Sequence, residues 1–474
     1  MTFFHWFWIF NAAVVILLVV NDRKRPEKTL AWIFILLLLP VVGILFYFFL
    51  GIEWKKYRLS SEIKVSKYLK ERYHNRESRL PEGNQLVDFL YNRNDSVLFK
   101  RNDVEVFFDG EELFEDIKDE IKKARHHIHM EYFIWQNDKL GNEIKDLLIQ
   151  KAGEGIVIRI IIDKVGSGGI DKKFENEMKN AGIELLFYSY FLRPFLKIFN
   201  LQLNNRDHRK LIIIDGNIGY IGGYNIGDEY LGKGKLGYWR DTHLKIKGDY
   251  VYSLQAVFSD DFYRTMKVEN IPDAFDGKYE KYFPAVSEKM NGVPLQTAKS
   301  GPRSISPSIM QAVVKLIESA EDHIYIITPY FVPTESVTNA LITAAYSGVD
   351  IRIIFPGKPD HPGVYNASQT YLNEVIGHGI KIYFYTPDAF IHAKSLTVDG
   401  KIGTVGTANM DVRSYKLNYE INTVIYDEKV IKKIEDQFEK DLSKSKLISD
   451  DYFNKLPFYV KIWQSIMRIF SGMY

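Results

Sequence analysis

The stretch Asn205–Gly227 decides the fold, and it reads NRDHRKLIIIDGNIGYIGGYNIG. It contains a histidine, a lysine and an aspartate in the spacing H-x-K-x4-D, and a Gly-Gly-Tyr-Asn tail follows. The same order returns in Ile391–Asp411, which reads IHAKSLTVDGKIGTVGTANMD. One copy would arise by chance about 0.1 times or fewer in a chain of this composition, so two copies indicate an internal duplication. The paired motif residues are His208, Lys210, Asp215 and Asn225 in the first copy and His392, Lys394, Asp399 and Asn409 in the second.

Alternating strand and helix patterns surround each motif. In the first half, strands are predicted at Val104–Phe108, His127–Ile134 and Ile156–Ile162, with a turn at Asp109-Gly110 and an amphipathic helix after the first strand. The second half repeats this order, and both halves carry the run I-R-I-I, at 158–161 and 351–354. The sequence therefore predicts an α/β fold with two similar lobes, 103–298 and 299–474. The Gly/Pro/Ser-rich stretch Asn291–Pro307 marks the boundary, and pseudo-twofold symmetry would bring both motifs to one interface.

The first 53 residues differ in composition from the rest. Two apolar runs, about 3–20 and 30–52, flank a basic loop at Asn21–Lys28. The second run is long enough to span a bilayer as a helix, and the first is near the lower limit of about 17 residues. A cleaved signal peptide fits badly, because no basic region precedes Phe3 and no small-residue cleavage site follows. Both runs lack the polar face of a globular helix, so we predict a transmembrane helical hairpin over 1–53.

A basic polar connector, 54–102, follows the predicted hairpin. Positive charge close to a membrane span favours the cytoplasmic side and attracts anionic lipid headgroups. The excess after the second run predicts that the bulk of the protein, including its catalytic part, is cytoplasmic, although the basic loop between the runs argues the other way. The basic residues that follow the second run are Lys55, Lys56, Arg58, Lys64, Lys67, Lys70 and Arg72.

Composition limits the partners and the compartment. The chain has 474 residues and a net charge of only +2, which does not suggest a nucleic-acid binder. It has no cysteine, which excludes disulfides and thiolate metal sites and suits a reducing compartment. With 46% hydrophobic residues it can bury a substantial core.

The motif residues suit chemistry at a phosphodiester. His208 and Lys210 are two apart on a predicted strand, so their side chains share a face, and the second copy repeats the arrangement. One neutral imidazole can attack phosphorus, while the other, protonated, can give its proton to the leaving alkoxide. The motif lysines, with Asn225 and Asn409, can stabilise the developing charge. We therefore expect phosphodiester transfer that needs no metal or other cofactor.

The paired motifs resemble those of the phospholipase D superfamily, whose members carry two such motifs around one active site. The superfamily pattern has a glutamate eleven residues after the motif asparagine, which is Glu420 in the second half. The corresponding first-half position is Leu236, which cannot serve; if Lys233–Gly237 is an insertion, Asp241 takes that place. The resemblance implies that these two carboxylates orient the imidazoles.

The same resemblance implies a covalent phosphatidyl-histidine intermediate, with His208 as the nucleophile. The nearly symmetric motifs do not decide between the two histidines on their own. Asp215 and Asp399 belong to the superfamily signature. Two roles are open for these aspartates: a direct chemical role, or a structural role in holding the turn after each motif strand.

Over its whole length the chain resembles the bacterial cardiolipin synthases of the phospholipase D type. The similarity includes Ala31-Trp32 and Leu39-Pro40 in the N-terminal region, Tyr238–Asp241 after the first motif and Asn409–Ser414 in the second. These enzymes join two phosphatidylglycerol molecules into cardiolipin and release glycerol. The resemblance implies that reaction here, at a bacterial cell membrane, with phosphatidylglycerol and anionic lipids as partners and no nucleic acid.

Two further apolar stretches fit a lipid substrate. Tyr188–Leu203, ahead of the first motif, and the C-terminal Leu456–Tyr474 both mix large apolar with basic residues, as membrane-surface segments do. Packing onto the domain core is the alternative for each. Two other functions stay open: a phospholipase D-type phosphodiesterase or nuclease, which the hairpin disfavours, and a non-catalytic membrane tether, which two intact motifs disfavour.

Two other clusters carry less weight. His126, His127 and His129 lie close together without carboxylates at metal-ligand spacing, so we interpret them as strand histidines. The run Gly166–Gly169 follows a strand but lacks the Lys-Ser/Thr of a phosphate-binding P-loop, which favours a plain loop.

Overall fold

The computed structural model describes residues 26–39, 84–188, 205–269, 279–284, 290–302, 304 and 306–473, with single positions between 6 and 69. The chain forms two compact units. The smaller unit comprises Met1–Ser61 with Tyr190–Asn204, and the larger comprises Glu62–Ser189 with Asn205–Tyr474. Both predicted α/β lobes lie in the larger unit, except for Tyr190–Asn204 of the first.

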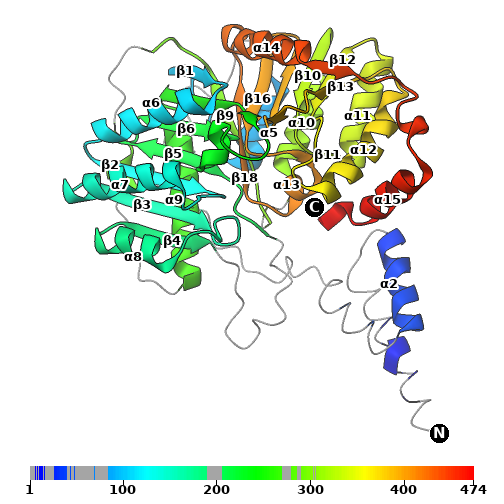
Figure 1. The fold of residues 1–474 in the computed structure, drawn as a ribbon, viewed down its shortest axis with the longest axis horizontal. Helices are drawn as coiled ribbons and strands as arrows, with labels where there is room; N and C mark the ends of the chain where they lie inside the picture. Colours follow the sequence, from blue (N-terminus) through cyan, green and yellow to red (C-terminus); the bar gives the residue numbers. More distant parts are fainter. Residues whose placement is uncertain are drawn as a thin grey trace. The chain divides into compact units, whose positions relative to one another are not determined.

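The first lobe is built on a seven-stranded mixed sheet in the order β1-β8-β6-β5-β2-β3-β4 (Figure 1). β2, β3 and β4 pair in parallel, and the other neighbours pair antiparallel. The strands are β1 (Asn102–Phe107), β2 (His127–Tyr132), β3 (Val157–Asp163), β4 (Glu184–Tyr188), β5 (Lys210–Ile214), β6 (Ile218–Gly222) and β8 (His243–Gly248). The helices are α6 (Gly110–Lys123), α7 (Lys139–Gly153), α8 (Lys172–Asn180) and α9 (Val251–Glu269).

The second lobe has an eight-stranded sheet in the order β19-β13-β12-β10-β15-β16-β18-β9 (Figure 1). Its strands are β9 (Leu295–Ser300), β10 (His323–Ile327), β12 (Asp350–Phe355), β13 (Lys381–Tyr385), β15 (Ser395–Val398), β16 (Ile402–Gly406), β18 (Glu420–Ile425) and β19 (Ser445–Leu447). Its helices are α10 (Ser308–Glu318), α11 (Glu335–Tyr346), α12 (Pro362–Ile376), the short α13 (Val412–Lys416), α14 (Glu428–Ser443) and the C-terminal α15 (Phe458–Ile469).

Seven strands of the second sheet repeat the topology of the first sheet, and only β19 has no counterpart among the described strands, which confirms the predicted pair of similar lobes. Reading β9-β18-β16-β15-β10-β12-β13 against β1-β8-β6-β5-β2-β3-β4 matches every strand in spatial order and in chain order. β9 is therefore the counterpart of β1 and opens the second repeat. The change of lobe falls before Leu295, within the stretch Asn291–Pro307.

Each sheet is buried on both faces, because alternate residues of its central strands enter different cores. In the first lobe, Ile160 and Ile212 pack in the core that contains α6, α7 and α8. Their neighbours Ile161 and Leu211 pack in another core, with α9 and with residues of the second lobe such as Ile431 of α14. This second core joins the lobes and holds their sheets in a fixed relation.

The predicted Asp109-Gly110 turn is instead the start of α6. Asp109 is the N-cap, and its carboxylate accepts hydrogen bonds from the backbone N–H groups of Glu111 and Glu112. Phe114, Ile117 and Ile121 of this amphipathic helix are buried. A residue type typical of turns thus begins a helix where its oxygen can satisfy free amides.

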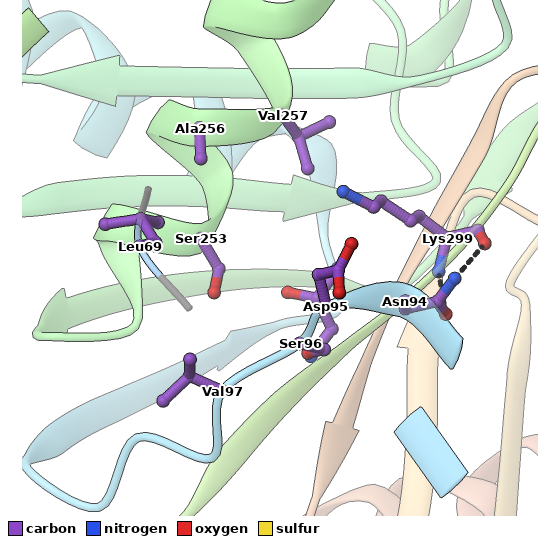
Figure 2. A pocket seen from close by; sticks show the side chains of 10 residues that line it. Leu69, Asn94, Asp95, Ser96, Val97, Ser253, Ala256, Val257 and Lys299 are labelled. Atoms are coloured by element: carbon purple, nitrogen blue, oxygen red, sulfur yellow. Dashed lines mark hydrogen bonds between the residues drawn. The ribbon is translucent and has the colours of Figure 1, made fainter. Parts of the chain in front are cut away.

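Part of the predicted polar connector folds against the second lobe. α5 (Gln85–Asn94) packs on α10 and β9. The side-chain amide of Asn94 makes two hydrogen bonds with the backbone of Lys299, as a neighbouring strand would (Figure 2). Asn94 and Lys299 line a small pocket together with Ser253 and Val257 of α9. None of the motif residues lines this pocket. Most of 54–83 lies outside the described residues.

The N-terminal unit is described mainly by one helix, α2 (Pro26–Leu38). The amide of Asn11 donates to the Leu36 carbonyl at 3.0 Å, which ties the two apolar runs together there. Among the described residues, no helix has both the length and the apolar composition needed to cross a membrane. Much of the predicted hairpin, with helices about 3–20 and 30–52, and most of the stretch Tyr188–Leu203 lie outside the described residues.

Candidate active site

The motif histidines lie just before their strands. β5 begins at Lys210 and β15 begins at Ser395, so His208, His392 and Lys394 occupy the short segments that lead into these strands. The prediction that histidine and lysine share a strand is therefore wrong for the second motif and half right for the first.

Backbone pairing between the lobes explains this placement. β14 (Ala389–Ile391) pairs in parallel with β7 (Tyr238–Arg240), and the His392 N–H then donates to the Arg240 carbonyl at 2.7 Å. In the first motif the His208 N–H donates to the Tyr419 carbonyl at 3.0 Å. Each motif thus reaches the site along backbone of the opposite lobe.

A carboxylate from the opposite lobe holds each imidazole. The Nδ1 atom of His208 lies 2.9 Å from Oε1 of Glu420, and the Nδ1 atom of His392 lies 2.7 Å from Oδ2 of Asp241. Both carboxylates are fully buried. This contact leaves Nε2 of His208 as the ring nitrogen not held by the carboxylate.

The tail of each motif makes room for its carboxylate. A Cβ at Gly223 would lie 2.0 Å from Oδ1 of Asp241, so a side chain there would displace the carboxylate. The second motif has Thr407 at that place, and its hydroxyl donates to Oε2 of Glu420 at 2.6 Å. The first motif therefore has glycine at this position, next to the carboxylate of Asp241. The second motif has threonine there, next to the longer side chain of Glu420. The residues Lys233–Gly237 lie in the turn between the short helix η5 (Asp228–Leu231) and β7, as an insertion before Asp241 requires.

The motif lysines are buried beside the histidines. Lys210 Nζ donates to the His208 carbonyl at 2.7 Å and lies over the ring of Phe133. Lys394 Nζ lies 2.8 Å from Nδ1 of His392 and donates to the His392 carbonyl. Two ammonium groups, two imidazoles and two carboxylates therefore share one buried volume.

Burial shifts the protonation of these groups. It lowers the pKa of His208 and of His392 to about 4, although Glu420 and Asp241 act in the opposite direction. It also lowers the pKa of Lys210 to about 7 and that of Lys394 to about 8. The charge of Lys394 adds to this shift at Lys210, so the two motifs act on each other electrostatically. An anion in the site would favour the protonated forms of all four groups.

The two motif asparagines are placed differently. Asn225 is engaged inside the first lobe, where its Oδ1 accepts from the Ile134 N–H and its Nδ2 donates to the Tyr230 hydroxyl. Asn409 is buried, and its Oδ1 has no hydrogen-bond partner among the described residues. Asn409 is therefore the asparagine with free polar capacity in the site.

Asp215 and Asp399 lie at the far ends of their strands. The Asp399 carboxylate accepts three backbone N–H bonds at 2.9 Å, from residues 321–323 at the start of β10. Asp215 does the same for residues 125–127 at the start of β2. Both have a positive φ of 53°. This geometry favours the turn-holding interpretation over the direct chemical role that we left open.

The two weaker clusters are structural. His127 and His129 lie beneath α9, where both contact Gln255, and the His129 ring stacks on Phe258. The described residues contain no cluster of the kind that could hold a metal ion. In the Gly166–Gly169 loop, the Asp163 carboxylate accepts from the amides of residues 165 and 166, so this loop is closed on itself.

Sequence reasoning missed three groups around the site. Phe133 and Trp239 pack on the His208 and His392 rings, at 4.9 and 5.0 Å between centroids. Arg240 of the first lobe makes a buried ion pair with Asp441 of the second at 2.8 Å. Asp360, next to α12, acts on the charges of His392 and Lys394. Among these residues, Trp239 and Arg240 had a signal in the sequence, because they lie in the run Tyr238–Asp241.

Comparisons with known proteins agree with this geometry. A family model described as cardiolipin synthase, PLD-like domain, matches residues 117–238 and 313–442, and a phospholipase D-nuclease N-terminal model matches residues 6–51. The crystal structure of a phosphatidylserine synthase from Haemophilus influenzae superposes with a TM-score of 0.63 at 17% identity, covering 82% of this chain and 97% of that chain. The fold and the paired motifs thus define a phospholipase D-like enzyme.

Relatives of known name identify the family within this class of enzymes. The chain is 38% identical to a cardiolipin synthase of Oceanobacillus iheyensis, over 98% of this chain and 97% of that protein. It is 37% identical to the major cardiolipin synthase of Bacillus subtilis, with the same coverage. The chain therefore belongs to the cardiolipin synthase family of phospholipase D-like enzymes.

Proposed function

We propose that this protein is a cardiolipin synthase that transfers a phosphatidyl group between two phosphatidylglycerol molecules. The observation that carries the proposal is the pair of cross-lobe contacts, His208 with Glu420 and His392 with Asp241. They give one site two oriented imidazoles, as a two-step displacement requires. Similarity to cardiolipin synthases over nearly the whole chain supports the choice of substrate.

In the first step, Nε2 of His208 attacks the phosphorus of phosphatidylglycerol. A phosphorus–nitrogen bond forms, and the bond from phosphorus to the headgroup glycerol oxygen breaks. His392 gives its proton to that oxygen, so free glycerol leaves. The phosphodiester's own negative charge favours protonated His392 in the complex, although burial keeps its pKa low in the free protein.

In the second step, the terminal hydroxyl of another phosphatidylglycerol takes the place of glycerol. Neutral His392 accepts the hydroxyl proton while the oxygen attacks phosphorus, and the phosphorus–nitrogen bond breaks to give cardiolipin. The buried ammonium groups of Lys210 and Lys394 stabilise the negative charge on the oxygens of the pentacoordinate phosphorus, and the side-chain NH2 group of Asn409 can donate to them. Because the two steps mirror each other, the transfer is reversible.

Hydrolysis is the competing outcome, because water at about 55 M can also attack the intermediate unless it is excluded. The motif histidines are more than nine-tenths buried, which limits access of water to the phosphorus. The test is product analysis with purified protein in phosphatidylglycerol vesicles. We expect cardiolipin and free glycerol in equal amounts. Phosphatidic acid with cardiolipin at background would identify a phosphodiesterase instead.

We also propose that the N-terminal unit places the enzyme at the bacterial cell membrane as a multi-pass protein with its lobes in the cytoplasm. The support is the pair of apolar runs and the basic residues after the second. Protease added to intact cells should spare the lobes. Cleavage within 84–473 without lysis would reverse this topology.

A further inference from the structure

The C-terminal helix α15 has one face anchored to the second lobe. Gln464 and Met467 are buried, and the Gln464 amide donates to Oε1 of Gln369 on α12 at 2.6 Å. The Arg468 guanidinium lies 4.2 Å from the ring centre of Tyr371 on α12. α15 is therefore a fixed part of the lobe rather than a loose tail.

The opposite face of α15 is exposed and almost entirely apolar. Phe458, Tyr459 and Ile469 have large apolar side chains, and these are 73–79% exposed. Basic side chains lie along the edge of this face rather than within it, at Lys461 and Arg468. A fixed helix that exposes so many large apolar side chains marks an interaction surface. The outward face consists of Phe458, Tyr459, Ile462, Trp463, Ile466, Ile469 and Phe470.

The buried side of α15 is connected to the active site through packed residues. Met467 packs with Val364 of α12 and with Val332 of β11 (Phe331–Val332). β11 pairs with β17 (Met410–Asp411), which follows Asn409 of the second motif directly. At the start of α12, Asp360 acts on the charge of His392. Two layers of packed side chains thus join α15 to the second motif.

We propose that the outward face of α15 is an interfacial membrane anchor that rests on an anionic lipid bilayer and, through α12, holds the second motif next to the lipid headgroups. The inference deepens the proposed function, because it rests on a lipid substrate and adds the surface that meets it. An apolar face rich in aromatic residues, with a tryptophan and a tyrosine, suits the boundary between headgroups and acyl chains. Lys461 at its edge suits anionic headgroups, whereas the charge of Arg468 is already paired with Glu374 of α12 at 2.6 Å.

A second copy of this chain is the other occupant that such a face could take. Lys461 argues against it, because a twofold contact centred on this edge would bring the Lys461 ammonium groups of the two copies together. Anionic lipid instead neutralises the charge of Lys461. The choice between the two occupants is an outcome of the experiment below.

The chain has no cysteine, so a single introduced cysteine can be labelled in the full-length protein. We would place an environment-sensitive fluorophore at Ile462→Cys, on the outward face, and at Lys122→Cys, near the Asp215 end of the first sheet. Both positions are exposed, at 45% for Ile462 and 56% for the side chain of Lys122. The labelled proteins are reconstituted in phosphatidylglycerol vesicles that contain acyl-chain quenchers, and iodide is the aqueous quencher.

We expect lipid quenching at position 462 to exceed that at 122 several-fold, with loss of iodide quenching at 462 alone. Equal iodide access at both positions would overturn the proposal. So would a label at 462 that is already shielded in detergent, which would point to a second copy or another part of the chain. Lipid quenching at position 462 with phosphatidic acid as the only product would support the membrane anchor and contradict the synthase activity. Cardiolipin formation without lipid quenching at position 462 would support the synthase activity and contradict the membrane anchor.

A matched pair of charge variants adds a functional readout. Ile462→Glu with Ile466→Glu places two charges on the outward face, while Leu447→Glu places one on β19, where Leu447 is 54% exposed. The double variant should lose about tenfold in transferase activity on vesicles, equivalent to about 1.4 kcal/mol of docking free energy, and little in detergent micelles. The same loss in both assays, or an equal loss with Leu447→Glu, would contradict a docking role.

Discussion

At the scale of single residues, the two histidines have the same support, and we propose different tasks for them. Each imidazole is held at Nδ1 by a carboxylate, so the chemistry must pass through Nε2. We expect His208→Ala and His392→Ala each to lower kcat by about 10⁴-fold or more, because attack and proton transfer need separate imidazoles. Rapid quenching with labelled phosphatidylglycerol should trap a phosphatidyl group on His208 in the wild-type protein.

The same trap in the two variants separates the tasks. His392→Ala should still form some labelled intermediate slowly, whereas His208→Ala should form none. Label that persists in His208→Ala and disappears in His392→Ala would exchange the two assignments. Substantial turnover by either variant would contradict the two-histidine mechanism.

The buried lysines predict how activity depends on pH. Burial lowers the pKa of Lys210 to about 7 and that of Lys394 to about 8, and each is cationic only below its pKa. The cation that stabilises the transition state is therefore present at lower pH and lost as pH rises through 7 to 8. We expect kcat/KM, which reports the free protein, to fall as the pH rises over that range. It should also fall as the pH drops below about 4, where the nucleophile His208 becomes protonated.

This profile should be measured at constant lipid composition, because the vesicle surface also attracts protons. A kcat/KM that stays level up to pH 10 would mean that the lysines keep their ordinary pKa values in the free site. If kcat/KM falls over the same pH range in a variant that lacks one of the two lysines, the other lysine is the titrating group.

The sequence identified the motif residues but not how tightly they are supported. His208, Lys210 and their second-lobe counterparts could be named because their spacing repeats. Asp241 could be named only by assuming an insertion, since Leu236 occupies its expected position. The supporting residues could not be predicted, because Trp239 and Phe133 reach the histidines only through the folded arrangement of the lobes.

At the scale of elements, the turn after each motif strand supports the fold rather than the chemistry. Asp399 has a positive φ of 53°, and its carboxylate accepts three backbone amides. These amides hold the pKa of Asp399 below its ordinary value, although burial acts in the opposite direction. We expect Asp399→Ala to lower the free energy of unfolding by about 2–4 kcal/mol while the folded fraction keeps most of its kcat.

The measurement is thermal unfolding together with activity per folded molecule, well below the midpoint. Asp399→Asn is the matched control, since asparagine tolerates a positive φ and still offers one acceptor oxygen. A loss of kcat comparable to that of His392→Ala, without a loss of stability, would return Asp399 to the chemical machinery.

The pair Arg240 and Asp441 joins β7 of the first lobe to α14 of the second. Both side chains are at most 2% exposed, and they meet through two contacts, at 2.8 and 3.2 Å. Arg240 also donates to the Asp241 carbonyl, so it positions the backbone of the carboxylate that holds His392. We expect Arg240→Met to cost about 3–5 kcal/mol, because it leaves a buried charge unpaired.

The double variant Arg240→Met with Asp441→Leu should regain much of the melting temperature, since an apolar pair can replace a buried ion pair. Its transferase activity should stay low, because the donor to the Asp241 carbonyl is still absent. Recovery of activity together with stability would show that Arg240 acts only in holding the lobes together.

Elements with strong periodicity could be predicted, and elements that depend on their neighbours could not. The strand predicted at Ile156–Ile162 is β3, Val157–Asp163, because its run of isoleucines fits only a doubly buried strand. β9 reads LQTAKS and lies in a Gly/Pro/Ser-rich stretch, so its sequence gives no sign of a strand. It forms because β18 offers it a free edge.

At the scale of the whole molecule, the site belongs to one chain. His208 and Glu420, like His392 and Asp241, pair across the lobes of the same protein. A mixture of the His208→Ala and His392→Ala proteins should therefore show no more activity than either alone. Recovery to about a quarter of wild-type activity would mean that lobes exchange between chains, as in a domain swap.

The cross-lobe contacts also determine when a new molecule becomes active. The carboxylate partner of His208 lies 212 residues further along the chain, and that of His392 lies 151 residues before it. At 5–20 residues per second, synthesis of that distance takes about 10–40 s. Throughout this interval the nascent chain carries a histidine and a lysine but no working centre, so it cannot damage the lipids around it. The nascent chain is therefore inactive, and the active site can assemble only after the ribosome has synthesised the last third of the protein.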